Sequence, residues 1–322
     1  MNINDANKGS TIMRATEHLV FEPLVDTLVE RNSVGMIVAP AKAKKSMLAL
    51  NLVFSLLTKK SFLGLKVSSP ARAEKIIYIN LELTKTALGV RLRTMDKHFH
   101  ATPKQMDNVL FFTASEFTND QPLVNIKTQT IETEPFRRLA EVAKQWGATV
   151  IIIDPLYYVV GEENDNVLMT AVIREFGKLR DELNATVFVV HHTGKGFKDW
   201  SDPFLAGRGA SSLAGAFEFV LGIEPKLNGE ARLHHGSRNY ASVDPMSIRF
   251  DDKTLTWRAC HEATADGIVD EIMKGVDSMP MEDFYKKANM SKAHADDLIK
   301  GCQTYQRIPG NRKQKAMLTR KL

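Results

Sequence analysis

Short, uninterrupted apolar runs alternate with helix-period segments along the first two thirds of the chain. The runs are continuous rather than alternating with polar residues, which is typical of strands buried on both faces of a parallel sheet. The intervening segments are long enough for right-handed crossover helices. The expected strands are 34–38, 75–81, 109–113, 149–153 and 185–190, and the expected helices are 46–57, 84–99, 134–146 and 168–183. This alternation predicts an α/β fold with a mainly parallel central sheet.

The pattern changes after about residue 216. Strands are expected at 217–223, 231–240, 247–250 and 254–259, with hairpin turns at 227–229 and 251–253, and these strands should extend the sheet antiparallel. From residue 265 the sequence is helix-like over 265–274, 281–288 and 291–302, and then 305–322 forms two short segments around Pro309-Gly310-Asn311. Helices followed by a hairpin predict a small helical, winged-helix-like domain. The expected divisions are an N-terminal segment 1–30, a main domain 31–260 and the small domain 261–322.

Composition excludes several classes of protein. With 43% hydrophobic and 25% charged residues, the chain is not of the disordered type. No apolar run approaches the ~18 residues of a membrane helix, and the N-terminus lacks a signal-peptide pattern. The two cysteines, Cys260 and Cys302, form no CxxC pair, so neither a disulfide scaffold nor a zinc finger is expected. We therefore expect a cytoplasmic protein without a membrane partner.

Positive charge is concentrated at the C-terminal end. The net charge is +5, and residues 271–322 hold 11 Lys/Arg against 6 Asp/Glu. From residue 305 onward there are six basic residues and no acidic ones. Such a segment indicates either a polyanion partner, nucleic acid first, or merely a solvated terminus. The candidate DNA contacts here are Arg307, Arg312, Lys313 and Lys315.

The first apolar run leads into a tight basic loop and then a helix that opens with Lys-Ser. This layout is that of a phosphate-binding loop, in which backbone N–H groups and a helix N-terminus face an anion. Lys45 would then neutralise phosphate charge, and the Ser46 hydroxyl would ligate Mg²⁺. The candidate nucleotide-binding residues are Ala39, Pro40, Ala41, Lys42, Ala43, Lys44, Lys45, Ser46 and Met47.

The loop departs from the GxxxxGK[ST] pattern, because Ala39 and Lys44 replace both glycines. Glycine is favoured where φ is positive or where the backbone approaches a ligand closely. A basic surface turn before a helix is therefore an open alternative for this segment alone.

Polar residues at the ends of later strands support the phosphate interpretation. Glu82 follows the strand at 75–81 and could polarise an attacking water, although a surface or N-cap Glu is the alternative. Asp154 ends the run VIIID, where a carboxylate can hold Mg²⁺. His192 ends the next strand, and Arg208 follows a Gly/Lys/Asp-rich loop in which Lys195 and Lys198 could contact DNA. Ligands for a zinc site are not found at suitable spacing.

Taken together, these residues resemble the RecA-like P-loop ATPases of the RepA type, which include hexameric plasmid and phage replicative helicases and are related to the DnaB and KaiC cores. The resemblance covers roughly residues 20–259 and rests on APAKAKKSMLALNLV, IIYINLE, VIIIDPLYYVVGEENDN, VVHHTGKG and GRGASSL, in that order. It implies a RecA-like fold in which Lys45 and Ser46 bind ATP and Mg²⁺. It also implies that Glu82 is the catalytic base, Asp154 the Walker B carboxylate, His192 the γ-phosphate sensor and Arg208 a finger that reaches a neighbouring subunit.

The resulting hypothesis is an ATP-dependent DNA helicase or translocase, a hexameric ring on single-stranded DNA in replication of a plasmid, phage or mobile element. A replication initiator or primase is a further candidate partner. One alternative is an ATP-switched DNA-binding replication or regulatory protein that does not unwind DNA. Another is an adaptor with an inactive ATPase, against which the retention of Glu82, Asp154 and Arg208 argues.

Overall fold

The computed structural model falls into two compact units, Met1–Arg258 and Ala259–Leu322. The structure describes residues 8–16, 22–68, 73–120, 124–125, 130–131, 133–160, 166–194, 196–207, 215–226, 229–260, 269, 272–274, 276–288, 292–300, 302, 304–310 and 315–321.

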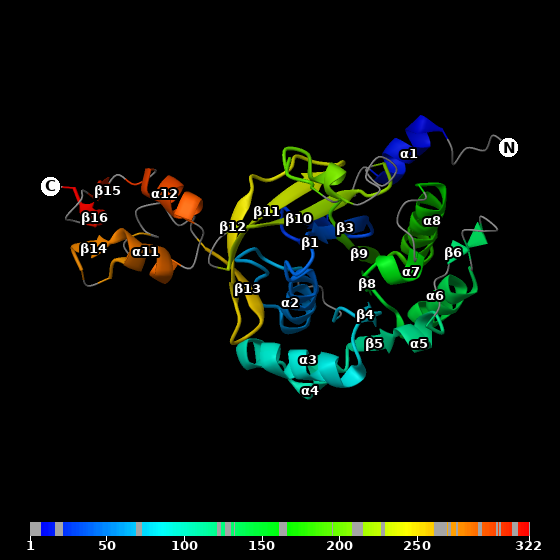
Figure 1. Cartoon of the computed structure of the whole chain (residues 1–322). Helices are drawn as coiled ribbons and strands as arrows, with labels where there is room; N and C mark the ends of the chain where they lie inside the picture. The colour runs from blue at the N-terminus through cyan, green and yellow to red at the C-terminus, as the bar shows by residue number, and fades with distance from the viewer. Residues whose placement is uncertain are drawn as a thin grey trace. The chain divides into compact units, whose positions relative to one another are not determined.

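The larger unit is built on a nine-stranded sheet of order β13-β12-β11-β10-β3-β9-β8-β4-β5 (Figure 1). Six neighbouring strands from β10 to β5 pair in parallel, and β11 and β12 then continue antiparallel. The expected antiparallel extension therefore begins one strand later than predicted, because β10 pairs in parallel with β3. The strands are β3 (Val34–Ala39), β4 (Ile76–Asn80), β5 (Val109–Thr113), β8 (Val150–Asp154), β9 (Thr186–His192), β10 (Phe219–Pro225), β11 (Glu230–Ser237), β12 (Met246–Asp251) and β13 (Thr256–Ala259).

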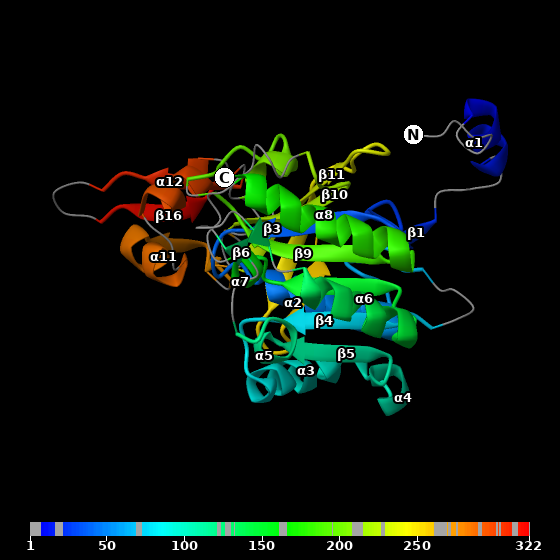
Figure 2. The ribbon, with the colours of Figure 1, turned by 90° about the vertical axis from the view of Figure 1, so that its right-hand side faces the viewer.

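Helices cover both faces of this sheet. Residues of α2 (Lys45–Thr58) and α3 (Lys85–Phe99) share one hydrophobic core, and those of α6 (Glu134–Trp146) and α8 (Asn166–Leu183) share the other. Figure 2 views the face that α6 and α8 cover. Successive side chains of β4 enter opposite cores: Tyr78 packs with α2 and α3, whereas its neighbour Ile77 packs on the other side. Burial on both faces is the physical reason for the uninterrupted apolar runs.

Part of the N-terminal segment 1–30 contributes to the core of the larger unit. β1 (Pro23–Val25) and β2 (Val29–Glu30) form an antiparallel hairpin, and Leu24 and Leu28 are fully buried with the residues of α2. The remaining short elements of the unit are α1 (Gly9–Thr16), α4 (Pro103–Met106), α5 (Ala114–Phe117), β6 (Val124–Asn125), β7 (Thr130–Ile131), α7 (Tyr157–Val160) and the 3₁₀ helix η2 (Pro203–Ala206).

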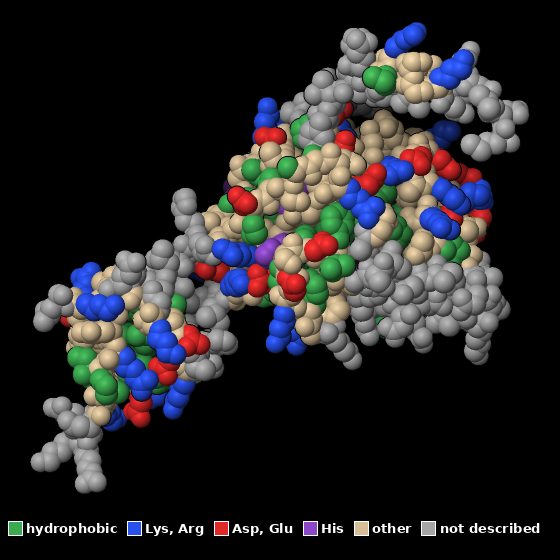
Figure 3. Space-filling view, turned by 90° about the horizontal axis from the view of Figure 1, so that it is seen from above, with side chains coloured by type: hydrophobic (Ala, Val, Ile, Leu, Met, Phe, Trp, Pro, Cys, Tyr) green, Lys and Arg blue, Asp and Glu red, His purple; other side chains and the backbone are tan. Residues whose placement is uncertain are grey.

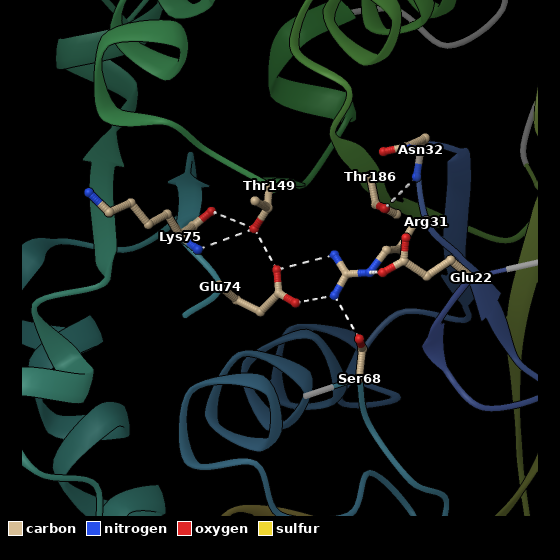
Figure 4. A network of polar contacts seen from close by, with 8 residues as sticks. All are labelled: Glu22, Arg31, Asn32, Ser68, Glu74, Lys75, Thr149 and Thr186. Atoms are coloured by element: carbon tan, nitrogen blue, oxygen red, sulfur yellow. Dashed lines mark hydrogen bonds and ion pairs between the residues drawn. The ribbon is translucent and has the colours of Figure 1, made fainter. Parts of the chain in front are cut away.

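A buried polar network joins the amino ends of the parallel strands (Figure 4). Arg31, just before β3, pairs with Glu74, just before β4, and Arg31 also donates to Ser68 at 2.8 Å. Thr149, just before β8, donates its hydroxyl to Glu74 at 2.6 Å. Removing one partner of a buried ion pair typically costs ~3–5 kcal/mol, so this network fixes the amino edge of the sheet. The carboxyl edge lies opposite, and Asp154 and His192 stand there at the ends of β8 and β9.

The smaller unit is organised around a three-stranded antiparallel sheet of order β14-β16-β15. Its elements are β14 (Ser278–Pro280), α11 (Met281–Ala288), α12 (Lys292–Lys300), β15 (Tyr305–Ile308) and β16 (Met317–Arg320). The expected hairpin at 305–322 is present, but the description as a helical domain is corrected, because β14 adds a third strand and Leu318 of β16 is fully buried among the helices. The expected helix at 265–274 lies largely outside the described residues. None of the helices described in either unit is long and apolar enough to cross a membrane.

Candidate nucleotide-binding site

A cavity of about 450 Å³ lies at the carboxyl ends of β3, β4, β8 and β9. This is the edge at which ligands bind in open α/β sheets, and the volume falls within the usual ~300–1,000 Å³ of ligand sites. Eight of the residues singled out in the sequence line it. The lining comprises Lys42, Lys44, Lys45, Ser46, Met47, Glu82, Arg91, Asp154, Pro155, His192, Phe250 and Leu255.

The Lys45 ammonium is buried at the floor of the cavity. It donates to the carbonyl oxygens of Ala39 and Pro40, both at 3.1 Å, and contacts Nδ1 of His192 at 3.0 Å. An ammonium can only donate, so Nδ1 must accept and the proton of a neutral His192 lies on Nε2. The imidazole of β9 is thereby coupled to the lysine of the loop.

The two replaced glycines behave differently. Ala39 is the last residue of β3, in extended backbone that tolerates any side chain. Lys44 adopts φ 62° and ψ 31°, the left-handed conformation for which glycine is normally used. Such a non-glycine residue costs about 1–3 kcal/mol. Trp257 of β13 offsets part of this cost, because its indole N–H donates to the Lys44 carbonyl at 3.2 Å.

Asp154, at the end of β8, is buried beside the loop. Its carboxylate accepts a hydrogen bond from the Tyr78 hydroxyl at 2.5 Å and another from Ser46. Burial raises the pKa of Asp154, and these two hydrogen bonds oppose that shift. The pKa of the Tyr78 hydroxyl is raised well above its ordinary value, first by burial and then by the Asp154 charge.

The donor set fits a magnesium ion. The Ser46 hydroxyl and the Asp154 carboxylate are hydrogen-bonded neighbours, and Mg²⁺ takes oxygen ligands, commonly one or two from protein with the rest from phosphate and water. Among the described residues no group of three or more His, Cys, Asp and Glu side chains could hold a metal by itself. Ser46 and Asp154 are therefore the residues that would hold Mg²⁺ together with a bound nucleotide.

Glu82 lies in the exposed turn between β4 and α3 and lines the cavity. Asn80 braces this turn, because its side chain donates to the Leu83 carbonyl at 2.6 Å and accepts from the Leu83 amide at 3.1 Å. Thr84 then caps α3 by accepting from the Ala87 amide. The backbone on either side of Glu82 is thus braced, while its carboxylate is exposed.

Sequence reasoning missed Arg91, Tyr78, Phe250 and Leu255. Arg91 could have been found, because it lies three residues after Leu88 and four before Met95 on the buried stripe of α3, where a cation is unusual. Phe250 and Leu255 carry no such signal, since their place in the cavity depends on how a distant hairpin packs.

The segment after His192 is anchored rather than loose. Thr193 forms a bridge with Gly207 and donates its amide to the Ala39 carbonyl at 3.1 Å. Between these ends, Trp200 stacks on His234 of β11 with centroids 5.1 Å apart. Lys198 is exposed on this segment, whereas Lys195 and Arg208 lie outside the described residues.

The candidate DNA contacts of the smaller unit are partly paired with acids. Arg307 lies 3.2 Å from Asp296, and Lys315 lies 2.9 Å from Glu282. Arg312 and Lys313 lie outside the described residues. Figure 3 shows Lys and Arg side chains interspersed with Asp and Glu over the faces in view. Exposed ion pairs contribute only about 0–1 kcal/mol, so these cations can still exchange partners for phosphate.

Comparison with known proteins gives two findings. A family model described as AAA domain (AAA_25) matches residues 16–197, which is 182 of the 322 residues. The structure is also similar to one titled "ATPase Domain of G40P", with a TM-score of 0.57 at 11% sequence identity, covering 81% of this chain and 100% of that chain. At this identity the second likeness is one of fold. The matched family range includes the phosphate loop, Glu82, Asp154 and His192.

Proposed function

This chain belongs to the AAA domain family of P-loop ATPases, and we propose that it is an ATP-dependent DNA helicase or translocase. In this proposal it forms a hexameric ring on single-stranded DNA during replication of a plasmid, phage or other mobile element. The observation that carries the ATPase part is the convergence of Lys45, Ser46 and Asp154 in one cavity, with Glu82 on its wall. The solved ATPase domain of similar fold supports the same activity.

In the proposed reaction each side chain of the cavity has a separate role. The Lys45 ammonium exchanges its two carbonyl partners for the phosphates of ATP. Ser46 and Asp154 would hold Mg²⁺, which would supply further positive charge to those phosphates. Glu82 accepts the proton of the water that attacks the γ-phosphorus, giving ADP and phosphate.

His192 links this chemistry to the rest of the subunit. When Lys45 turns toward phosphate, Nδ1 of His192 loses its present partner and can report the occupancy of the cavity. His192 continues directly into the anchored segment whose other end is Gly207. We propose that this segment carries the change to DNA through Lys195 and Lys198, and to a neighbouring subunit through Arg208.

The test is ATP hydrolysis with and without single-stranded DNA, together with strand displacement and light scattering for particle size. Lys45→Ala should lose ATP binding, and Glu82→Gln should bind ATP without turning it over, because an amide cannot take the proton. Hydrolysis by Glu82→Gln at the parental rate would contradict the assignment of the base.

A second candidate function is an ATP-switched DNA-binding replication or regulatory protein. The strained Lys44 in a glycine position favours it, since this loop departs from that of efficient ATPases. DNA binding that changes with ATP, without any strand displacement by the assembled protein, would support this second function over the first.

A further inference from the structure

The cavity wall includes apolar side chains that phosphate chemistry does not use. Among them are Phe250 and Leu255, which come from the hairpin formed by β12 and β13. The other lining residues include Lys45, Ser46, Glu82, Asp154 and His192, which serve the phosphates in the function proposed above. A nucleotide held by its phosphates at Lys45 must place its base somewhere along the same cavity.

The hairpin is fixed to the phosphate loop by buried hydrogen bonds. The Trp257 amide donates to the side-chain oxygen of Asn51 on α2 at 3.0 Å, and the Asn51 amide group donates back to the Trp257 carbonyl at 3.4 Å. The indole N–H of Trp257 reaches the Lys44 carbonyl. Asn51 and Trp257 are both buried. The hairpin therefore keeps a set position relative to the phosphates, as a pre-organised binding site requires.

Backbone strain marks the same hairpin. Leu255 adopts φ 55°, a left-handed conformation that is rare for a leucine. The turn before it is held by Asp251, whose side chain accepts from the amides of Lys253 and Thr254 at 2.9 and 3.3 Å. Strain of this kind persists where surrounding structure enforces it, and it collects at ligand sites. Here the residue with the strained backbone, Leu255, has its apolar side chain in the cavity wall.

The Phe250 ring carries a weakly held cation, and both residues line the cavity. The Lys44 ammonium lies 5.1 Å from the ring centroid and 4.0 Å from Asp252, and both charged side chains are largely exposed. An exposed cation–π contact and an exposed ion pair are both weak. A base stacked on an aromatic ring is held more strongly than either of these contacts holds the ammonium. A base can thus replace the ammonium, while Trp257, at 5.2 Å between centroids, supports the ring from within.

We propose that Phe250 and Leu255 form the subsite for the base of the bound nucleotide. The base packs on the ring of Phe250 in the place that the Lys44 ammonium occupies in this structure, and the displaced ammonium turns toward the phosphates. This proposal rests on the nucleotide-binding function proposed above, because the phosphates must be held at Lys45 for the base to reach the hairpin.

Calorimetric titration of the full chain with ATP and with inorganic tripolyphosphate, both with Mg²⁺, tests the subsite. Phe250→Leu should weaken ATP binding about tenfold, the loss expected from one stacking contact, and leave tripolyphosphate binding unchanged. Leu255→Gly should weaken ATP binding several-fold with the same selectivity, and it relieves a positive φ, so the fold is kept. Phe112→Leu, on β5 and against the opposite core, is the matched control and should change neither affinity.

Equal losses for both ligands in Phe250→Leu and Leu255→Gly would overturn the subsite, because the hairpin would then act through the phosphate loop. Unchanged ATP affinity in both variants would also overturn it. A parental protein that binds tripolyphosphate as tightly as ATP would refute the subsite and leave the phosphate site standing. A parental protein that binds neither ligand would refute the proposed function itself.

Discussion

Tyr78 shows how one residue of a central strand can serve both the hydrophobic core and the candidate site, through its contact with Asp154. Tyr78 belongs to an apolar run and its ring packs with α2 and α3, yet its hydroxyl reaches Asp154 on the neighbouring strand. The two residues lie on adjacent parallel strands, β4 and β8. The hydroxyl donates to one carboxylate oxygen, Oδ2, and so fixes the orientation of the group proposed to hold Mg²⁺.

Replacing Tyr78 with Phe should therefore loosen the metal site without removing the ring. We expect the Mg²⁺ concentration that gives half of the full increase in ATP affinity to rise by ~10-fold or more. Losing a partner that orients a metal ligand typically lowers metal affinity by ~10–100-fold. Nucleotide affinity measured in the presence of a chelator should not change. Equal weakening with and without Mg²⁺ would mean that Tyr78 supports the loop as a whole rather than Asp154.

The residues of the candidate site were predictable from the sequence where they follow strands. Asp154 and His192 end buried strands, and Glu82 stands two residues beyond one. Lys45 opens the helix that follows the loop after β3. Parallel strands bring such positions to one edge of the sheet. Phe250 could not be predicted in this way, because β12 joins the sheet through β11 and its distance from the loop is set by tertiary packing. The conformation of Lys44 was also beyond the sequence, since the pattern shows a missing glycine but not which of the two needs a positive φ.

At the scale of elements, the segment from Thr193 to Gly207 differs most from expectation. Its composition indicated a Gly/Lys/Asp-rich loop, but its aromatic residues pack on β10 and β11. Trp200 lies over Gly222 of β10, and Phe204 lies over Gly236 of β11. Aromatic rings can approach the backbone this closely only where the strand has no Cβ. The pairing of a glycine on one strand with a ring from another segment is visible only in three dimensions.

Gly222→Ala should displace this segment. An added Cβ would lie 2.4 Å from the Trp200 ring, which real contacts do not allow, so the indole must move. We expect the unfolding free energy to fall by about 1–3 kcal/mol, as in other overpacked sites, and hydrogen exchange over 196–207 to accelerate. Gly177→Ala in α8 is the control, since no atom lies within 4 Å of its added Cβ and it should stabilise the helix by up to ~1 kcal/mol. Unchanged exchange in Gly222→Ala would mean that other contacts hold the segment.

At the scale of the whole molecule, the basic C-terminal end is part of a folded unit. Tyr305 and Leu318 of its hairpin are buried in the core of the smaller unit, so deleting 305–322 would remove two of the three strands. DNA binding by this end is therefore tested by substitution. Four Gln replacements, at Arg307, Arg312, Lys313 and Lys315, remove the charge and keep the hairpin.

We expect the four replacements to weaken binding to single-stranded DNA and to make its salt dependence shallower, by up to about 3 in the slope of log K against log salt. Basal ATP hydrolysis should be retained, because the site lies in the larger unit. Gln at Lys274, Lys286, Lys287 and Lys292 removes the same charge from the same unit and should leave the slope nearly unchanged. Equal effects of the two sets would show that net charge alone, and not the hairpin, attracts DNA.

The inter-subunit part of the proposal depends on Arg208. Gly207, the residue before it, is bridged to Thr193, which binds the Ala39 carbonyl at the start of its own phosphate loop. Two arrangements are then possible: Arg208 contacts the nucleotide in the cavity of its own subunit, or it contacts the nucleotide of a neighbouring subunit in a ring. We propose the second arrangement. Arg208→Ala should then bind ATP nearly normally and hydrolyse it ~10³–10⁵-fold more slowly, since the guanidinium acts on charge that develops in the transition state.

Mixing two inactive variants decides between these outcomes. A Lys45→Ala subunit keeps Arg208, and an Arg208→Ala subunit keeps Lys45. In a head-to-tail ring of randomly mixed subunits, about one quarter of the interfaces combine an intact loop with an intact arginine. Activity should therefore reappear on mixing, to roughly that fraction of the parental rate, and light scattering must show that both variants still assemble. If assembled mixed rings stay inactive, Arg208 completes the site of its own subunit, as the bridge at Gly207 allows. In that case no site takes its arginine from a neighbouring subunit.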